Sequence, residues 1–362
     1  MWKSLDVTMV LVLCLFVACG QDAAPEAEQE PPANATEPVT GEESEEPAAR
    51  DLSLDSVEFA TMSNDAQDLM LTYSTAELFW PQVGFSEPAE VIVTFDALPA
   101  IVSGETWIAQ GDTSTFWAAM DEGSVDLVMV GVDKDNEIRI LGARPGIASV
   151  EDIEPGMTAS GGDVGDYDEL VLREVLTELG VNPDDLQIIS MGGGADARMG
   201  ALIAEQLDLG IQQPRNIGPL TDAGGAILYE EAAEVPQEIW IVTREVWNEN
   251  RDAVCAFIEG RIMGKLWAAE GEDMRANIDE ALEIVRRYDI DPSEDELADW
   301  ARELQGNQSL DGGTTIEGLD QFQANLQQLG IVSEDFEWRD HADFSCLHEA
   351  QENLGLEPRP VQ

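Results

Sequence analysis

The stretch Met191 to Arg215, MGGGADARMGALIAEQLDLGIQQPR, decides the fold. Three glycines precede a segment whose apolar residues recur at helical spacing, so we expect a helix with one face packed on a sheet. These apolar residues are Ala195, Met199, Leu202 and Ile203. Asp196, Arg198 and Glu205 fall on the opposite face, which we expect to be exposed. Residues 209–211 predict a short strand, and a Gln-Gln-Pro-Arg loop follows it.

Both ends of this unit offer groups that a ligand can use. The amides of Gly193, Gly194 and Ala195 lie at a helix N-terminus, where free N–H groups and the helix dipole favour an anion or a polar oxygen. The candidate side chains after the strand are Gln212, Gln213 and Arg215. A guanidinium can hold a carboxylate, sulfonate or phosphate with two N–H groups. The alternative for Arg215 is a surface arginine paired with an acid.

Further candidates follow from the rule that open α/β sheets bind ligands at the carboxyl ends of their strands. The stretch Ile101 to Thr115, IVSGETWIAQGDTST, has the same layout of strand, polar loop and helix start. The ligand-binding candidates at these strand ends are Ser63, Asn64, Asp112, Thr113, Ser114, Gly161, Gly162, Asp163, Asp166 and Tyr167. A helix cap is the alternative role for Asp112 or Thr113, and the favoured one for Asp166.

Strands and helices alternate along the chain, which indicates an α/β fold with a mostly parallel sheet. Val91 to Phe95 predicts a buried strand. Residues 125–130 and 138–141 flank an Asp-Lys-Asp-Asn turn, which predicts a hairpin. The Arg-Pro-Gly break at residues 144–146 marks a first crossing between two lobes, and Ile239 to Val242 carries the chain back.

The N-terminal segment predicts export. Lys3 is its only basic residue, an apolar run from Val7 to Ala18 follows, and Cys19 comes next. This run is too short to span a bilayer comfortably, which fits a cleaved secretion signal. It resembles a bacterial lipoprotein signal, in which Cys19 becomes the lipidated N-terminus; the alternatives are a plain signal peptide and an uncleaved anchor. Residues 20–51 are rich in Ala, Pro and Glu, so we expect a disordered acidic tether.

The composition excludes some partners. The formal net charge is −56, from 74 acidic and 18 basic residues, which makes nucleic acid and anionic membrane surfaces poor partners. An acidic surface with few lysines also indicates a saline habitat, where salt screens the repulsion between carboxylates; the alternative is a merely acidic secreted protein. Cys255 and Cys346 remain beyond the signal, and they form either one disulfide or two buried thiols.

Little in the sequence points to catalysis. The two histidines, His341 and His348, lie near the C-terminus, and no spacing typical of a metal site occurs. Neither a serine nucleophile elbow nor a phosphate-binding loop is present. We therefore expect no enzymatic activity, no metal and no cofactor.

The order of several motifs carries a family resemblance. These motifs are GxxxIAQGDTS from Gly104, GIASVEDI from Gly146, the glycine loop at Gly161, GVNPDDLQII from Gly180, and the GGGADAR to QQP stretch. Together they resemble the substrate-binding proteins of ABC importers, in the branch that binds nitrate, aliphatic sulfonates, taurine and thiamine-pyrimidine precursors. The resemblance covers roughly Ser56 to Leu329, and the second lobe carries most of it.

The resemblance implies a periplasmic-binding-protein fold of type II, with two α/β lobes, two crossover strands and C-terminal helices packed on lobe one. The expected organisation is a signal peptide at 1–19, the tether at 20–51, the first part of lobe one at 52–144, lobe two at 145–238, and the return to lobe one with C-terminal helices at 239–362. The implied protein is a monomeric, lipid-anchored, extracytoplasmic receptor that delivers a small polar or anionic solute to an ABC permease and its ATPase. Two rival functions stay open: a pyrimidine-precursor enzyme on the same scaffold, and a surface lipoprotein that binds a protein or cations.

Overall fold

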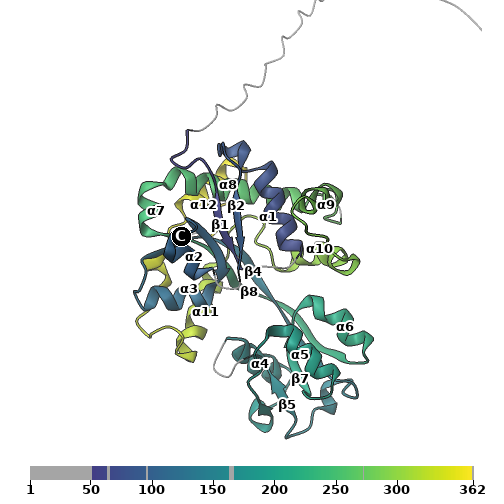
Figure 1. Cartoon of the computed structure of the whole chain (residues 1–362). Helices are drawn as coiled ribbons and strands as arrows, with labels where there is room; N and C mark the ends of the chain where they lie inside the picture. The colour runs from purple at the N-terminus through teal and green to yellow at the C-terminus, as the bar shows by residue number, and fades with distance from the viewer. Residues whose placement is uncertain (1–50, 63–65, 95–96, 163–166, 272, 361–362) are drawn as a thin grey trace, which may run out of the picture. The chain divides into compact units, whose positions relative to one another are not determined.

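One mixed sheet runs through the chain. The computed structural model describes residues 51–62, 66–94, 97–162, 167–271 and 273–360. Its eight-stranded sheet has the order β2-β1-β3-β8-β4-β7-β5-β6. Figure 1 shows the strands with helices packed around them. The strands are β1 Glu58–Thr61, β2 Glu90–Val93, β3 Ile108–Asp112, β4 Leu127–Ala143, β5 Thr158–Ser160, β6 Gln187–Ile188, β7 Leu209–Gln212 and β8 Ala226–Thr243. The short outer strands pair in parallel, whereas β4 and β8 pair antiparallel with each other and with their neighbours.

Twelve α-helices in the described residues cover this sheet. Those that precede β8 are α1 Ala66–Leu78, α2 Leu98–Ser103, α3 Thr113–Asp121, α4 Tyr167–Glu178, α5 Gly194–Ile203 and α6 Ile217–Asp222. Those that follow β8 are α7 Arg244–Glu249, α8 Arg251–Ala268, α9 Ile278–Arg286, α10 Glu294–Gly306, α11 Ile316–Leu329 and α12 Ser345–Asn353. None of the helices in the described ranges has the length and apolarity to span a membrane.

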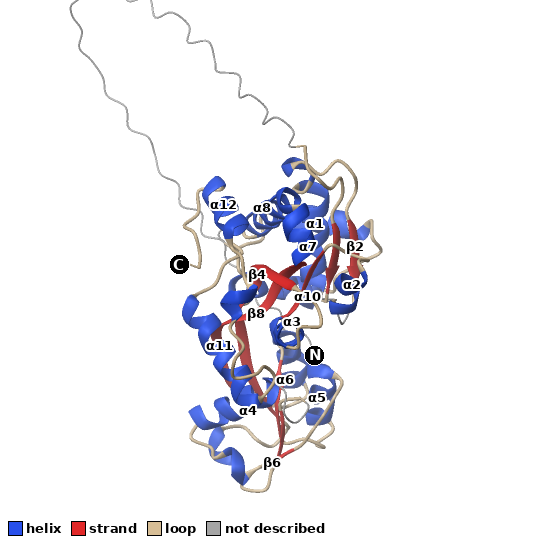
Figure 2. Cartoon of the chain, turned by 90° about the vertical axis from the view of Figure 1, so that its left-hand side faces the viewer, coloured by secondary structure: helices blue, strands red, loops and turns tan. Residues whose placement is uncertain are grey.

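Strands β4 and β8 connect two separate cores. They pair over nearly their whole length, from Leu127 opposite Thr243 to Ala143 opposite Ala226. At one end they enter a core with β1, β3, α8 and α12, and at the other a core with β5, β7 and α4. Figure 2 shows the two long strands between these groups of helices. The expected architecture of two lobes with two crossover strands is confirmed.

The predicted hairpin is wrong, because β4 continues through residues 131–137 without a turn. Asp, Lys and Asn favour turns in isolation. Here Asp133 and Lys134 pair with buried groups of opposite charge, so an extended backbone can carry them through the interior. Lys134 pairs with Glu238 across the ladder, and the register shifts on either side of it.

In the first lobe, apolar side chains from β1, β3, β4 and β8 pack against α8 and α12. Phe59, Trp240 and Phe257 form ring contacts in this core, with centroids 5.3 Å apart for Phe59 and Phe257 and 6.1 Å apart for Trp240 and Phe257. The expected buried strand at residues 91–95 is only partly correct. It forms the edge strand β2, whose side chains are half-buried or exposed because no strand pairs beyond it.

In the second lobe, α5 forms as the deciding stretch predicts, and Ala195 and Leu202 are buried against the sheet. Two expectations on this helix are wrong, because Ile203 of the predicted apolar face is 38% exposed and Arg198 is only 2% exposed. Its Nε donates to the Ile211 carbonyl at 2.8 Å, and its guanidinium lies 3.4 Å from Asp168. A long side chain can thus reach from the polar face of a helix to buried acceptors, which helical spacing does not reveal.

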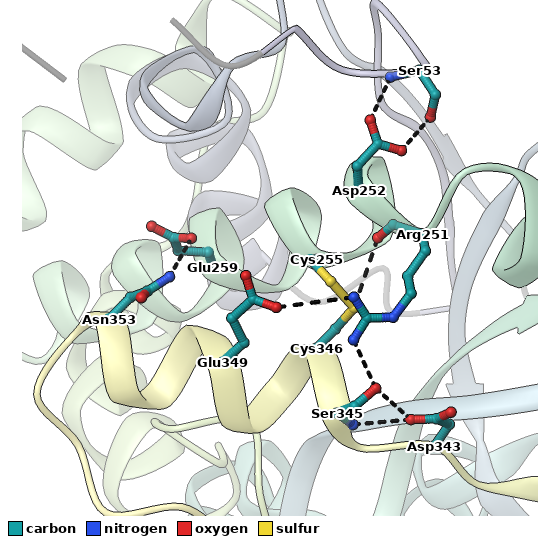
Figure 3. The surroundings of a disulfide bond; sticks show 10 residues. All are labelled: Ser53, Arg251, Asp252, Cys255, Glu259, Asp343, Ser345, Cys346, Glu349 and Asn353. Atoms are coloured by element: carbon teal, nitrogen blue, oxygen red, sulfur yellow. Dashed lines mark hydrogen bonds and ion pairs between the residues drawn. A yellow bond between two sulfur atoms is a disulfide. The ribbon is translucent and has the colours of Figure 1, made fainter. Parts of the chain in front are cut away.

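A disulfide joins Cys255 of α8 to Cys346 of α12, as one of the two alternatives predicted (Figure 3). The same pair of helices is also connected by Arg251, which donates to the Ser345 hydroxyl at 2.9 Å. The first described residues attach here too, since the Ser53 backbone N–H donates to Asp252 at 2.7 Å. The disulfide therefore fixes the C-terminal helix on the core of the first lobe.

Replacing Cys346 by Ala is expected to destabilise the protein. The bond spans 91 residues of sequence, and loop-closure entropy then favours the bonded fold by roughly 4–5 kcal/mol. The measurement is urea unfolding of the oxidised protein and of Cys346→Ala. Reductant should lower the midpoint of the wild type alone; equal midpoints for oxidised and reduced wild type would contradict the prediction.

Candidate ligand-binding site

The carboxyl ends of β3 in one lobe and of β7 in the other lie beside the crossover strands β8 and β4, and the sequence places ligand loops at both. Four of the predicted ligand residues, Ser63, Asn64, Asp163 and Asp166, lie outside the described residues. The others are described, and the protein itself engages most of their polar groups.

The loop after β3 serves as the start of α3. The Asp112 carboxylate accepts from the Thr115 N–H at 3.0 Å, so Asp112 has the helix-cap role that was the alternative to ligand binding. The Ser114 hydroxyl also donates to Asp112. Thr113 is fully buried, and its hydroxyl donates to the Pro236 and Gln237 carbonyls of β8. Capping and ligand contact can coexist, so the ligand role of these three residues stays a prediction.

In the second lobe, Gly161 is required by close packing, because a Cβ there would lie 2.1 Å from the Asp168 carbonyl oxygen of α4. Gly162 is buried beside it. Tyr167 begins α4 and makes contacts in two directions. Its hydroxyl donates to Glu137 of β4 at 3.2 Å, and its ring lies 4.9 Å from that of Phe322 in α11. Tyr167 therefore links the second lobe to a helix that packs in the first.

The start of α5 lies near the loop after β7, since Asn216 donates to Asp196 at 2.8 Å. Gly193 and Gly194 have φ values of 90° and 72°, a region that favours glycine, and Ala195 is the first buried residue of the helix. Gln212 is fully buried, and neither its side-chain oxygen nor its nitrogen has a hydrogen-bond partner. Gln213 follows it and forms a capping pair with Asn216.

Arg215 forms an ion pair in this structure. Its Nε lies 3.3 Å from an oxygen of Asp196, and its side chain is 42% exposed. The same carboxylate oxygen accepts from Asn216 at 2.8 Å. Hydrogen bonding to Asn216, together with the charge of Arg215, lowers the Asp196 pKa. A solute anion would have to compete with Asp196 for Arg215.

Sequence reasoning missed a group of polar residues that we call the hinge cluster: Asp68, Gln110, Lys134, Glu238 and Gln308. The Lys134 ammonium lies 2.7 Å from Asp68 of α1 and 3.2 Å from Glu238 of β8. Gln110 of β3 donates to Glu238 and accepts from the Thr61 hydroxyl at the end of β1. Gln308 donates to Asp68 at 2.8 Å.

All five residues of the hinge cluster are buried, and each is at most 9% exposed. Burial raises the pKa of the Glu238 carboxyl to about 7; Lys134 opposes this shift, and Asp68 and Asp133 add to it. The signal that sequence reasoning overlooked was Lys134 itself. Lys134 and Lys265 are the two lysines after residue 19 of the chain, and both are buried.

A second buried group lies on the α8 side of β4. Asp133 accepts from Trp240 Nε1 at 2.9 Å, and it pairs with Lys265 at 3.0 Å and with Arg261 at 3.3 Å. Although burial acts to raise the pKa of Asp133, the charges of Lys265 and Arg261 hold it well below its usual value. Asp133 thus neutralises two cations that have no access to water.

A third group continues along β4 into the second lobe. Arg139 pairs with Glu137 at 3.2 Å and with Glu174 of α4 at 3.0 Å. Burial raises the pKa of Glu137 to about 7, against the opposing charge of Arg139. The described residues contain no group of three or more His, Cys, Asp or Glu side chains able to hold a metal ion.

Comparison with solved structures identifies the fold. The chain resembles the periplasmic nitrate-binding protein NrtA from Synechocystis with a TM-score of 0.61 and 11% identity, over 84% of this chain and 90% of that one. It resembles the periplasmic aliphatic sulphonate binding protein SsuA from Escherichia coli with a TM-score of 0.58 and 14% identity, over 80% and 92% of the two chains. The expected fold of two-lobed periplasmic binding proteins is confirmed.

One similar structure is named as an enzyme. The desulfurization enzyme DSZB matches with a TM-score of 0.58 and 13% identity, over 83% of this chain and 99% of that one. No protein-family model and no curated protein matches the sequence. At such low identities the likenesses establish the fold, and a function has to be argued from the site.

Replacing Asp133 by Asn is expected to cost about 3–5 kcal/mol of unfolding free energy, because Arg261 and Lys265 would keep buried charges without a counter-ion. Chemical denaturation measures the loss. Asp320→Asn is the matched control, since Asp320 pairs with Arg339 at an exposed position and should change stability by less than about 1 kcal/mol. Similar effects of the two substitutions would refute the assigned role of Asp133.

Proposed function

We propose that this protein is an extracytoplasmic solute-binding lipoprotein of an ABC importer. The observation that carries the proposal is the pair of crossover strands, which join the two lobes and pair with β3 of one lobe and β7 of the other. Two of the similar structures are named as periplasmic binding proteins, for nitrate and for an aliphatic sulphonate. The captured molecule is then a small polar or anionic solute, and the partners are a permease and its ATPase.

The mechanism is closure of the two lobes around the solute. A ligand that bonds both lobes stabilises the closed arrangement by the difference between its affinities for the closed and open forms. Strands β4 and β8 are the elements that bend, since both of the described chain passages between the two cores run along them. The contacts proposed for the solute come from Asp112 to Ser114, from the start of α5 and from the loop at Gln212 to Arg215.

We propose binding without turnover by a monomer that needs no cofactor. The sequence offers no serine nucleophile elbow, phosphate-binding loop or metal spacing, which supports this view. Because the enzyme DSZB has a similar structure, the alternative function is that of an enzyme on the same fold. Mass spectrometry of a bound solute after long incubation distinguishes the two: an unchanged mass supports a receptor, and a product supports an enzyme.

A lipid anchor would hold the protein at the membrane from which the solute is imported. The proposal rests on the apolar run that ends at Cys19 and on the acidic, Pro-rich composition of residues 20–51. A tether of that composition resists compaction, so it would let the receptor domain extend away from the membrane. The low number of lysines and the charge of −56 support a saline environment.

Replacing Cys19 by Ala is expected to release the protein from the membrane. Without the thiol no lipid can be attached, while Asp51 to Gln362 stays unchanged. Fractionation of cells that express the wild type or Cys19→Ala measures the partition between membrane and soluble fractions. A wild type that is entirely soluble, or a Cys19→Ala variant that stays on the membrane after cleavage of the signal, would count against the anchor.

If Arg215 binds an anionic group of the solute, Arg215→Ala should weaken binding by about tenfold or more. Titration calorimetry with the solute that gives the largest thermal shift measures the effect. Arg244→Ala is the matched control, because Arg244 forms a similar pair with Asp126 at 3.4 Å on the first lobe. Unchanged affinity in Arg215→Ala would remove Arg215 from the ligand site without affecting the receptor proposal.

A further inference from the structure

The charge balance of the described residues limits what the cleft can bind. Every described Lys and Arg except Arg275 has a carboxylate within 4.0 Å. Arg275 donates to the Leu297 carbonyl at 2.8 Å. An incoming anion would therefore have to displace a carboxylate from its cation, and the displaced carboxylate would need another partner. The site is poorly suited to a solute whose only polar group is an anion.

The hinge cluster has the opposite property. Two carboxylates, Asp68 and Glu238, share the single ammonium of Lys134. The neighbouring cations Arg261 and Lys265 pair with Asp133 on the α8 side. The cluster thus offers more anionic oxygens than cationic donors.

One acceptor of the cluster has no partner. Gln308 donates its Nε2 to Asp68 at 2.8 Å, which identifies the other amide atom as the oxygen, because a carboxylate requires a donor. This oxygen, Oε1, has no hydrogen-bond partner, although the residue is only 5% exposed. A buried acceptor without a donor costs about 1–3 kcal/mol, so an N–H group placed there would gain this energy back.

The location of the cluster suits a ligand. Lys134 and Glu238 lie in the crossover strands, Gln110 is near the end of β3, and Asp68 is in the first turn of α1. The cluster thus lies where the carboxyl end of β3 and the start of α1 meet the interior of the two crossover strands. Because these residues are buried, a solute can reach them only when the protein opens around them.

We propose that the captured solute carries a protonated amino group, which binds Asp68, Glu238 and Gln308 Oε1 in the hinge cluster. The inference rests on the proposed function and names the chemical class of its solute. An ammonium supplies up to three N–H donors, and the three acceptors belong to one connected group, since Gln308 donates to Asp68 and Lys134 pairs with both carboxylates. An acidic group elsewhere on the solute is compatible with the cluster and is not required by it.

The first test compares solutes that differ only in the amino group. The full mature protein is titrated with taurine against isethionate, glycine against glycolate, and ethanolamine against ethylene glycol, with nitrate as a bare anion. At least one amino member should bind at least about tenfold more tightly than its hydroxyl counterpart, since a hydrogen bond to a charged group is worth about 1.5–3 kcal/mol. Equal or tighter binding of the hydroxyl members or of nitrate would overturn the inference and leave the receptor proposal intact.

The second test uses variants with the amino solute that binds best. Glu238→Gln and Gln308→Met should each weaken binding by about tenfold, whereas Glu234→Gln should not, because Glu234 is an exposed carboxylate on the same strand. Unchanged affinity in both cluster variants would overturn the inference. If either variant fails to fold, the comparison of amino and hydroxyl solutes on the wild type still decides.

A pH series adds an independent measurement. Glu238 faces Lys134, Asp68 and Asp133, and its carboxyl ionises as the pH rises through about 7. Affinity for the amino solute should therefore increase from about pH 6 to about pH 8 in the wild type and stay level in Glu238→Gln. An affinity that falls over this range in the wild type would contradict the inference. Absence of binding across the whole panel would remove the receptor proposal, and this inference with it.

Discussion

The pairing of buried charges along β4 is the constraint on which the rest of the structure depends. The strand connects the two cores, and between them it carries Asp133, Lys134, Asp135, Glu137 and Arg139, each no more than 9% exposed. Buried charges of this kind are tolerated only when each has partners of opposite sign and further hydrogen bonds. The partners come from α1, α4, α8 and β8, so helices of both lobes are held against one strand by electrostatic pairing as well as by apolar contact.

Periodicity predicted the elements that bury an apolar face, such as α4, α5 and the strands of both cores. It failed where polar residues are buried. The Asp-Lys-Asp-Asn sequence has the composition of a turn, and only partners distant in the chain, such as Asp68 and Arg261, allow it to be a strand. Arg198 was misplaced for the same reason, since its acceptor is a carbonyl of another element. Tertiary pairing thus overrides local preference.

The loops proposed for ligand contact could be predicted from the sequence, but the hinge cluster could not. Strand ends identified Asp112, the start of α5 and Arg215, because the α/β rule depends on topology alone. The hinge cluster could not be found this way, since its members are separated by up to 240 residues of sequence, from Asp68 to Gln308. Apart from Lys134, which stands out because the chain has so few lysines, each member is unremarkable where it stands in the chain. The chemical preference of the site therefore depends on distances that a single sequence does not contain.

The disulfide has a consequence for motion. Cys255 and Cys346 enclose a segment that begins after β8, so the covalent ring includes neither crossover strand nor any part of the second lobe. The ring gives the first lobe a rigid frame, while no covalent cross-link among the described residues opposes rotation of the second. The disulfide therefore stiffens the first lobe, whereas the crossover strands stay free to bend. Oxidation of the two cysteines can stabilise the first lobe without restricting the movement of the second.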